Sequence, residues 1–134
     1  MKLTSLSPML QVDDLQKTID YYVTVLGFTC DAHEPGWGWA SLIKDEINIM
    51  LALPNQHIPY HHPLLTGSIY LRTDDVDAWW SKLKNNSEIV YPIKDFEYGL
   101  REFAIKDCNG YILQFGQNKS QVDLKQMAFL RSNE

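Results

Sequence analysis

The sequence predicts an α+β fold, in which two tandem βαβββ repeats form a curved, mostly antiparallel eight-stranded sheet around a cavity. Three observations predict it. Residues 7–15 match residues 68–76 at a constant offset of 61 positions. In both segments a short extended run precedes two aspartates and an amphipathic helical pattern, and strand-like runs follow each helix. Because each short sheet carries one helix, its other face is uncovered, and the two uncovered faces are expected to enclose a ligand cavity.

Composition excludes several classes of protein. A length of 134 residues suits one domain, and 45% hydrophobic with 22% charged residues excludes a disordered, collagen-like or coiled-coil chain. Twelve basic and seventeen acidic residues give a net charge of −5, which disfavours binding to nucleic acid or to an anionic membrane. No apolar run approaches the ~20 residues of a membrane span, and the first eight residues lack a signal-peptide core. We therefore expect a cytoplasmic protein.

The first repeat covers about residues 5–53. One helical face carries Leu15, Ile19, Tyr22 and Leu26. Asp13 is the expected N-cap, with Gln16 completing a capping box, and Gly27 ends the helix. Strands are predicted over residues 37–43 and 47–53, with a turn near residues 44–46.

The second repeat covers about residues 68–117. A linker over residues 54–67 precedes it, marked by Pro54, Pro59, Pro63 and Gly67. Its helix begins at Val76, carries Trp79 or Trp80 on the buried face, and ends near Asn85. Strands are predicted over residues 88–91, 101–106 and 111–116, the last two joined by an Asn-Gly turn.

The tail over residues 118–134 is polar except for Val122 and an apolar group that comprises Leu124, Met127, Ala128, Phe129 and Leu130. It is either a short helix packed on a partner or a frayed end. The two cysteines, Cys30 and Cys108, have neither a zinc nor a redox spacing, and we expect both to be free thiols.

Four motifs connect the chain to a known family. They are Tyr21-Tyr22 followed by Leu26-Gly27-Phe28, Asp107-Cys108-Asn109-Gly110-Tyr111, Tyr98-Gly99-Leu100-Arg101-Glu102-Phe103-Ala104, and Ile112-Leu113-Gln114-Phe115-Gly116-Gln117. Over about residues 5–117 the sequence resembles the vicinal oxygen chelate superfamily, which includes glyoxalase I, extradiol dioxygenases, fosfomycin-resistance enzymes and bleomycin-resistance proteins. The third motif is most similar to the bleomycin-resistance branch.

This resemblance implies four metal-ligand positions, two in each repeat, where the enzymes carry His, Gln or Glu. The matching positions hold Ser7, Asn48 (or Met50, if the register shifts by two), Ser68 and Gln114. These are neutral, weak donors, and no carboxylate or imidazole remains to neutralise a dication. We therefore expect no metal and no cofactor. Four histidines, His33, His57, His61 and His62, are expected to be solvated loop residues, although an adventitious surface ion could occupy those of the linker.

Strand alternation predicts which side chains line the cavity. The expected lining is Trp37, Trp39, Asn48, Met50, Ser68, Glu102 and Gln114, with Tyr98 or Phe96 on a loop above. Flat aromatic rings suit stacking on a planar ligand, and indole faces with one carboxylate suit a cation. An alternative is that the tryptophans only fill a shallow groove between subunits. At least one of the two tryptophans of the second helix is expected in the core.

These features favour a metal-free small-molecule binding protein of bleomycin-resistance type. It would sequester a flat aromatic ligand, which can be cationic, in a cavity at the interface of a homodimer. A dimer is expected because uncovered sheet edges and apolar faces are normally covered. The alternatives are a glyoxalase- or dioxygenase-like enzyme, a lyase or isomerase that uses a metal, and a metal-free enzyme or stress-response protein. In a metal-free enzyme, Glu102 would be the obvious acid–base group.

Overall fold

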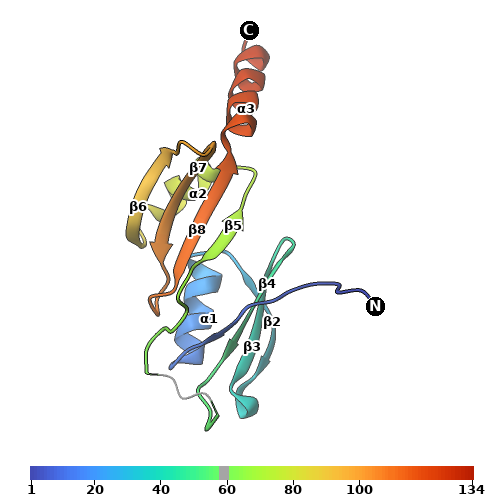
Figure 1. Cartoon of the computed structure of the whole chain (residues 1–134), viewed down its shortest axis with the longest axis vertical. Coiled ribbons are helices and arrows are strands. Elements are labelled where there is room, and N and C mark those ends of the chain that lie inside the picture. The colour runs from blue at the N-terminus through green and yellow to red at the C-terminus, as the bar shows by residue number, and fades with distance from the viewer. Residues whose placement is uncertain (58–60) are drawn as a thin grey trace. The chain divides into compact units, whose positions relative to one another are not determined.

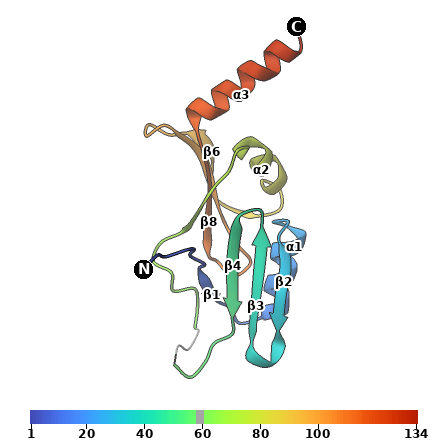
Figure 2. The same cartoon turned by 90° about the vertical axis from the view of Figure 1, so that its right-hand side faces the viewer.

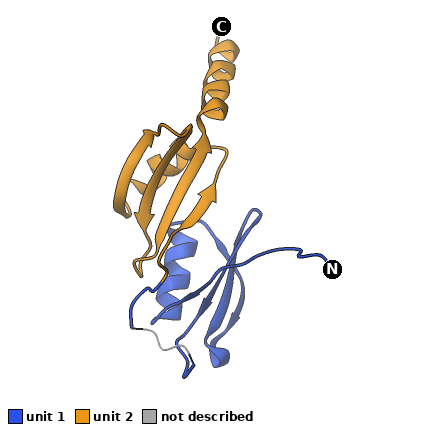
Figure 3. Cartoon of the chain, in the orientation of Figure 1, with its two compact units in different colours: residues 1–64 blue, residues 65–134 orange. Residues whose placement is uncertain are grey.

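The computed structural model describes residues 1–57 and 61–134, and the chain divides into two compact units, residues 1–64 and 65–134 (Figure 3). Each unit contains a four-stranded sheet, with strand order β1-β4-β3-β2 in unit 1 and β5-β8-β7-β6 in unit 2 (Figure 1). The two orders are equivalent, since each first strand pairs in parallel with the last strand of its unit, and the other pairs are antiparallel. The predicted α+β class and the tandem βαβββ repeat are confirmed, with the eight strands divided between two mixed sheets.

Unit 1 consists of β1 (Met9–Gln11), α1 (Leu15–Thr24), β2 (Thr29–Glu34), a 3₁₀ turn η1 (Pro35–Trp37), β3 (Trp39–Lys44) and β4 (Ile47–Ala52). One face of its sheet packs against α1, and the core there includes Leu10, Ala40, Leu42, Ile49 and Leu51. The strand β2 was not among the predicted strands. It is a largely exposed edge strand, so it lacks the alternation of buried apolar residues that marks the others.

Helix α1 begins one residue later than the sequence predicts. Its N-cap is Asp14 and not Asp13, because the Asp14 carboxylate accepts the Lys17 backbone N–H at 3.0 Å. The helix ends before Gly27, whose φ of 78° is the left-handed conformation expected of a terminating glycine. The second helix is capped in the same way by Asp75, 61 positions further on, which accepts the Ala78 N–H at 3.1 Å.

Unit 2 consists of β5 (Ile69–Arg72), α2 (Val76–Leu83), β6 (Glu88–Asp95), β7 (Leu100–Lys106), β8 (Ile112–Asn118) and α3 (Lys119–Ser132). Both tryptophans of α2 pack on the sheet. The Trp79 ring lies 5.0 Å from that of Phe115, and the Trp80 ring lies 5.2 Å from that of Phe103, measured between centroids. The tail is thus a helix, α3, which extends from the end of β8 (Figure 2). No helix among the described residues has the length and apolar character needed to cross a membrane.

One predicted strand boundary is wrong. Trp37 lies in η1 and not in β3, because Pro35 starts a 3₁₀ turn. Gly38 ends that turn in a left-handed conformation, with φ 61°, and β3 begins at Trp39. Strand alternation therefore does not apply to Trp37, whose side chain is free of the sheet, with 81% of the residue exposed.

Candidate functional site

A buried carboxylate stands on the open face of the unit 2 sheet, opposite α2. Glu102 in β7 is only 2% exposed, although no cation pairs with it among the described residues. Three phenol hydroxyls donate to it instead. Tyr70 donates to Oε2 at 2.6 Å, Tyr91 donates to Oε1 at 3.2 Å, and Tyr98 also donates to Oε1. These hydrogen bonds offset the free-energy cost of removing the carboxylate from water.

The backbone register explains how the sequence assembles this cluster. Glu102 pairs with Gly116 of β8, and Tyr70 of β5 lies opposite Gln114, so all four side-chain positions share one face. A Cβ at Gly116 would lie 2.0 Å from the Tyr70 hydroxyl oxygen. The glycine is therefore what allows the phenol of Tyr70 to lie across β8 and reach Glu102.

The cluster keeps its phenols protonated. Burial, followed by the hydrogen bond to Glu102, raises the pKa of Tyr70 far above its ordinary value. The hydrogen bond to Glu102 raises the pKa of Tyr98 to about 12. Burial raises the pKa of Tyr91, and the Gln114 amide that donates to it at 2.8 Å opposes the increase. All three groups are consequently hydrogen-bond donors at neutral pH.

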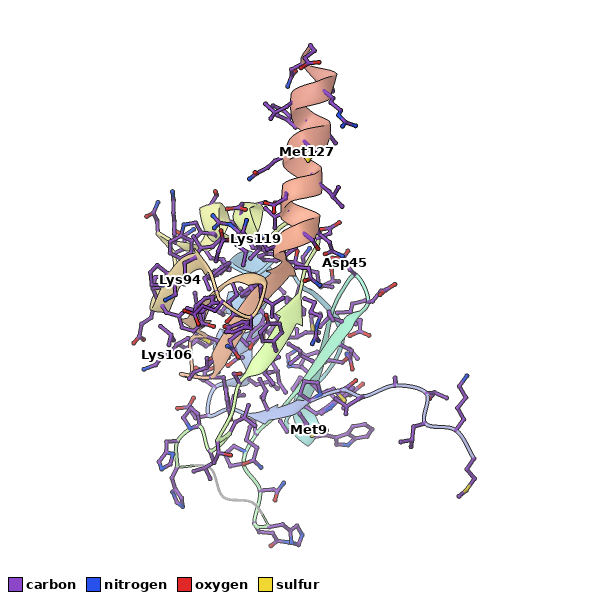
Figure 4. The ribbon with its side chains drawn as sticks, turned by 45° about the horizontal axis from the view of Figure 1, so that its top comes forward. Met9, Asp45, Lys94, Lys106, Lys119 and Met127 are labelled. Carbon is purple, nitrogen blue, oxygen red and sulfur yellow. The ribbon has the colours of Figure 1, made fainter. Side chains whose placement is uncertain are left out.

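Aromatic rings adjoin the carboxylate and its phenols, and two cations lie over rings of this group. In the β6–β7 turn, the Phe96 ring stacks on Tyr98 at 5.2 Å and meets Tyr91 edge-on at 5.6 Å. Lys94, labelled in Figure 4, places its Nζ 4.6 Å from the centre of the Phe96 ring. Arg72 lies over the Tyr70 ring at 5.3 Å. These ring faces already bind cationic groups of the protein.

The positions that correspond to metal ligands in the resemblance hold hydroxyl–amide pairs. Ser68 donates to the Gln114 carbonyl oxygen in unit 2, and Ser7 donates to that of Asn48 at 2.5 Å in unit 1. The Asn48 amide in turn donates to Ser41 at 2.8 Å. These neutral groups already bind one another, so they do not fit a divalent metal. The described residues also contain no cluster of three His, Cys, Asp or Glu that could hold one.

Strand register shows which positions are equivalent in the two units. Met9 pairs with Met50 as Tyr70 pairs with Gln114, so Met50 is the register equivalent of Gln114. Asn48 lies two residues earlier on the same face.

Trp39 has its own equivalent in unit 2. Ala52 lies two residues after Met50, as Gly116 lies two residues after Gln114. Trp39 pairs with Ala52 and Glu102 pairs with Gly116, so Trp39 is the equivalent of Glu102. Unit 1 therefore presents an indole and two thioethers where unit 2 presents a carboxylate, a phenol and an amide.

Most of the residues predicted to bind ligand fall into two groups, one in each unit. Ser68, Glu102, Gln114 and Tyr98 belong to one hydrogen-bonded cluster, while Trp39, Asn48 and Met50 share the open face of the unit 1 sheet. Trp37 stands apart on η1. Sequence reasoning missed Tyr70 and Tyr91, although the alternation from Ser68 and the small residue Gly116 could have indicated Tyr70.

Within the part of the chain that the structure describes, the four histidines do not assemble with other metal ligands. His33 lies on the exposed edge strand β2, and His57, His61 and His62 are exposed in the linker. Pro59 of the linker lies outside the described residues.

Comparison with known proteins identifies the family. The model of the Glyoxalase/Bleomycin resistance protein/Dioxygenase superfamily matches residues 5–115. The chain belongs to this superfamily. A search of curated proteins found no significant match.

Several solved structures share the superfamily fold. TioX from Micromonospora sp. ML1 is 22% identical, with a TM-score of 0.70 over 86% of this chain and 98% of TioX. A bleomycin-binding protein from Streptomyces verticillus, complexed with copper(II)-bleomycin, is 21% identical, with a TM-score of 0.67 over 86% of this chain and 96% of its own. Lactoylglutathione lyase from Agrobacterium tumefaciens is 21% identical, with a TM-score of 0.69 over 87% and 94%. At these identities the similarity shows the fold alone, because one fold carries many functions.

Proposed function

We propose that this superfamily member binds a flat, cationic aromatic small molecule and sequesters it without chemical change, in a cavity at the interface of a cytoplasmic homodimer. A role in antibiotic resistance follows if the ligand is a drug. The observation that carries the proposal is Glu102, a carboxylate with three phenol donors and no cationic partner among the described residues.

The carboxylate supports a preference for positive charge. A carboxylate has about four lone-pair sites, and the three phenols use three of them. Oε2 accepts one hydroxyl, from Tyr70, so it retains capacity for one donor from a ligand. A ligand amine or amidine that donates there would form a charge-assisted hydrogen bond with the buried group.

Flat surfaces in both units support the aromatic part of the ligand. The stacked rings of Phe96 and Tyr98 border Glu102, and 62% of Tyr98 is exposed to solvent. Trp39 is half-buried on the open face of the unit 1 sheet. A planar ligand can stack on either surface.

Binding without catalysis is favoured over a metal-dependent lyase or dioxygenase because of the donor set. Ser7 with Asn48, and Ser68 with Gln114, supply hydroxyls and amides that already hydrogen bond to one another. No step of a metal-dependent reaction can be assigned to them.

The test is calorimetric titration with three planar probes that differ in charge: proflavine, neutral acridone and anthracene-9-carboxylate. We expect proflavine to bind most tightly. Trp39→Ala should remove a stacking surface worth ~1–3 kcal/mol, which is roughly a ten- to hundredfold loss of affinity. Glu102→Gln should weaken proflavine and leave acridone nearly unchanged. Bleomycin is a further probe, since it is the ligand named for a structural neighbour.

The matched control is Trp79→Phe, a change on α2 at the opposite face of its sheet. It should alter stability more than affinity. The proposal fails if the anionic probe binds more tightly than proflavine, because Arg72 and Lys94 would then dominate recognition. It also fails if Trp39→Ala and Glu102→Gln bind like the wild type.

A further inference from the structure

Helix α3 carries an apolar surface that its own unit leaves uncovered. Val122 alone is buried in this 14-residue helix, whereas Leu124 and Leu130 are each 65% exposed and Met127 is 49% exposed. Figure 4 labels Met127 midway along α3, beyond the strands of unit 2. Large apolar side chains gathered on a projecting helix indicate a partner surface.

Only the first half of α3 is anchored. The Lys119 N–H donates to the Gly99 carbonyl at 2.9 Å, and Lys125 pairs with Asp75 at 2.5 Å. A cavity of about 500 Å³ lies between α3 and the start of α2, and Val122, Phe129 and Leu130 are among the residues that border it. A helix of this length is marginally stable in water unless a face is packed. Apart from the side chains that border this cavity, the second half of α3 has no face packed within unit 2.

Three of the four large apolar residues exposed on α3, Leu124, Met127 and Leu130, form one stripe, and Phe129 lies on another side of the helix. At 100° per residue, the positions three and four apart from Met127 lie on its face, and these are Asp123, Leu124, Leu130 and Arg131. The stripe is symmetric about Met127, with a leucine three residues away on each side and opposite charges four residues away. A surface with this symmetry is complementary to itself when turned end for end.

We infer that α3 pairs with α3 of a second copy of this chain, antiparallel and centred on Met127. In that arrangement Leu124 is level with Leu130 of the other copy, and Asp123 is level with Arg131 of the other copy. A parallel pair would instead align Asp123 with Asp123 and Arg131 with Arg131, which like-charge repulsion opposes. Asp123 also pairs with Lys119 of its own helix at 3.1 Å, and its attraction to Arg131 of a second copy favours the antiparallel direction.

The area that this contact buries determines how much it can contribute to a dimer. Complete burial of a leucine or methionine removes roughly 60–120 Å² from water, so the six half-exposed side chains of two copies would bury on the order of 400 Å². A stable dimer interface buries about 1,200–2,000 Å². The α3 pair therefore strengthens the proposed homodimer and does not form it alone, and in this sense the inference rests on the proposed function.

Cysteine cross-linking tests the geometry. In a full-length Cys30→Ser, Cys108→Ser background, Met127→Cys should form a disulfide-linked dimer with oxidised glutathione. Leu124→Cys should not link to itself, because the two copies of this residue would lie about 9 Å apart along the helix axis at 1.5 Å per residue. A mixture of Leu124→Cys and Leu130→Cys chains should cross-link.

The control is Gln121→Cys, an exposed position on a different side of α3. If Met127→Cys cross-links no better than Gln121→Cys, the inferred pair is wrong. Self-linking of Leu124→Cys would overturn the antiparallel direction.

Sedimentation equilibrium separates this inference from the proposed function. Met127→Lys should weaken the dimer at least tenfold, and an unchanged dissociation constant would overturn the inference while leaving the homodimer intact. A wild-type chain that is monomeric at micromolar concentration would overturn both. If the dimer weakens but proflavine affinity is unchanged, the α3 pair stands and the ligand cavity is independent of it.

Discussion

Replacing Gly116 with alanine should disconnect Tyr70 from Glu102. The added Cβ would lie 2.0 Å from the Tyr70 hydroxyl oxygen and 2.7 Å from Cζ, and real Cβ atoms do not approach other atoms this closely. The ring must move, and the 2.6 Å hydrogen bond to the buried carboxylate is lost. A hydrogen bond to a charged group contributes ~1.5–3 kcal/mol, while Gly→Ala restricts the unfolded chain by ~0.4–1 kcal/mol. We expect the free energy of unfolding to fall by about 1–2 kcal/mol.

Urea denaturation of Gly116→Ala, Tyr70→Phe and the double variant provides the assay. Both single changes remove the same hydrogen bond, so the double variant should cost less than the sum of the two. A spectrophotometric titration gives a second readout, because the raised pKa of Tyr70 should return toward its ordinary value once the phenol leaves Glu102. The reasoning is refuted if Gly116→Ala is as stable as the wild type, or if the Tyr70 titration does not change.

Three further predictions follow from features described above. Asp14→Ala should lower the free energy of unfolding by ~0.5–2 kcal/mol, whereas Asp13→Ala should change it by less than ~0.5 kcal/mol; equal effects in denaturation would contradict the observed cap. The Lys125 ammonium lowers the pKa of Asp75, so this pair stabilises the fold above the ordinary pKa of an aspartate and loses its effect as the pH falls through the lowered value. Lys125→Met should therefore show a shallower loss of stability between about pH 5 and pH 2, followed by thermal melting, than the wild type. Chelator treatment, or addition of zinc or nickel, should leave the melting temperature unchanged, and a rise on metal addition would show that the donor set has been misjudged.

The fold was predictable because the spacing of apolar residues reveals both the repeat and the alternation of side chains along the strands. Phe103 and Ile105 place Glu102 on the opposite face, and the structure confirms this parity. The edge strand β2 was missed because an exposed strand needs few apolar side chains, as Thr29–Glu34 shows. Trp37 was misplaced because alternation was extended across Gly38, where the backbone turns.

The candidate site was only partly predictable. The carboxylate of Glu102 stands out in an apolar strand, but the phenols that contact it come from β5, β6 and a turn, up to 32 positions away. Tyr91 was missed because β6 contains two register shifts, and after a register shift strict alternation no longer predicts which face a side chain is on. Tyr70 reads as an ordinary strand residue, and only the close approach at Gly116 reveals its contact with the carboxylate. Such contacts depend on cross-strand register, which a single sequence records weakly.

The equivalence of Trp39 and Glu102 has an evolutionary consequence. If an ancestral half assembled as a symmetric pair of separate chains, one substitution would change both equivalent positions at once. Duplication of that half within one chain would first have placed identical residues at the two positions. Once joined in one chain, the two copies became separate targets of selection. A lineage could then alter Trp39 in one half without altering Glu102 in the other. Related chains are therefore expected to vary independently at these two positions, which under the proposed function would change the stacking surface and the charge preference separately.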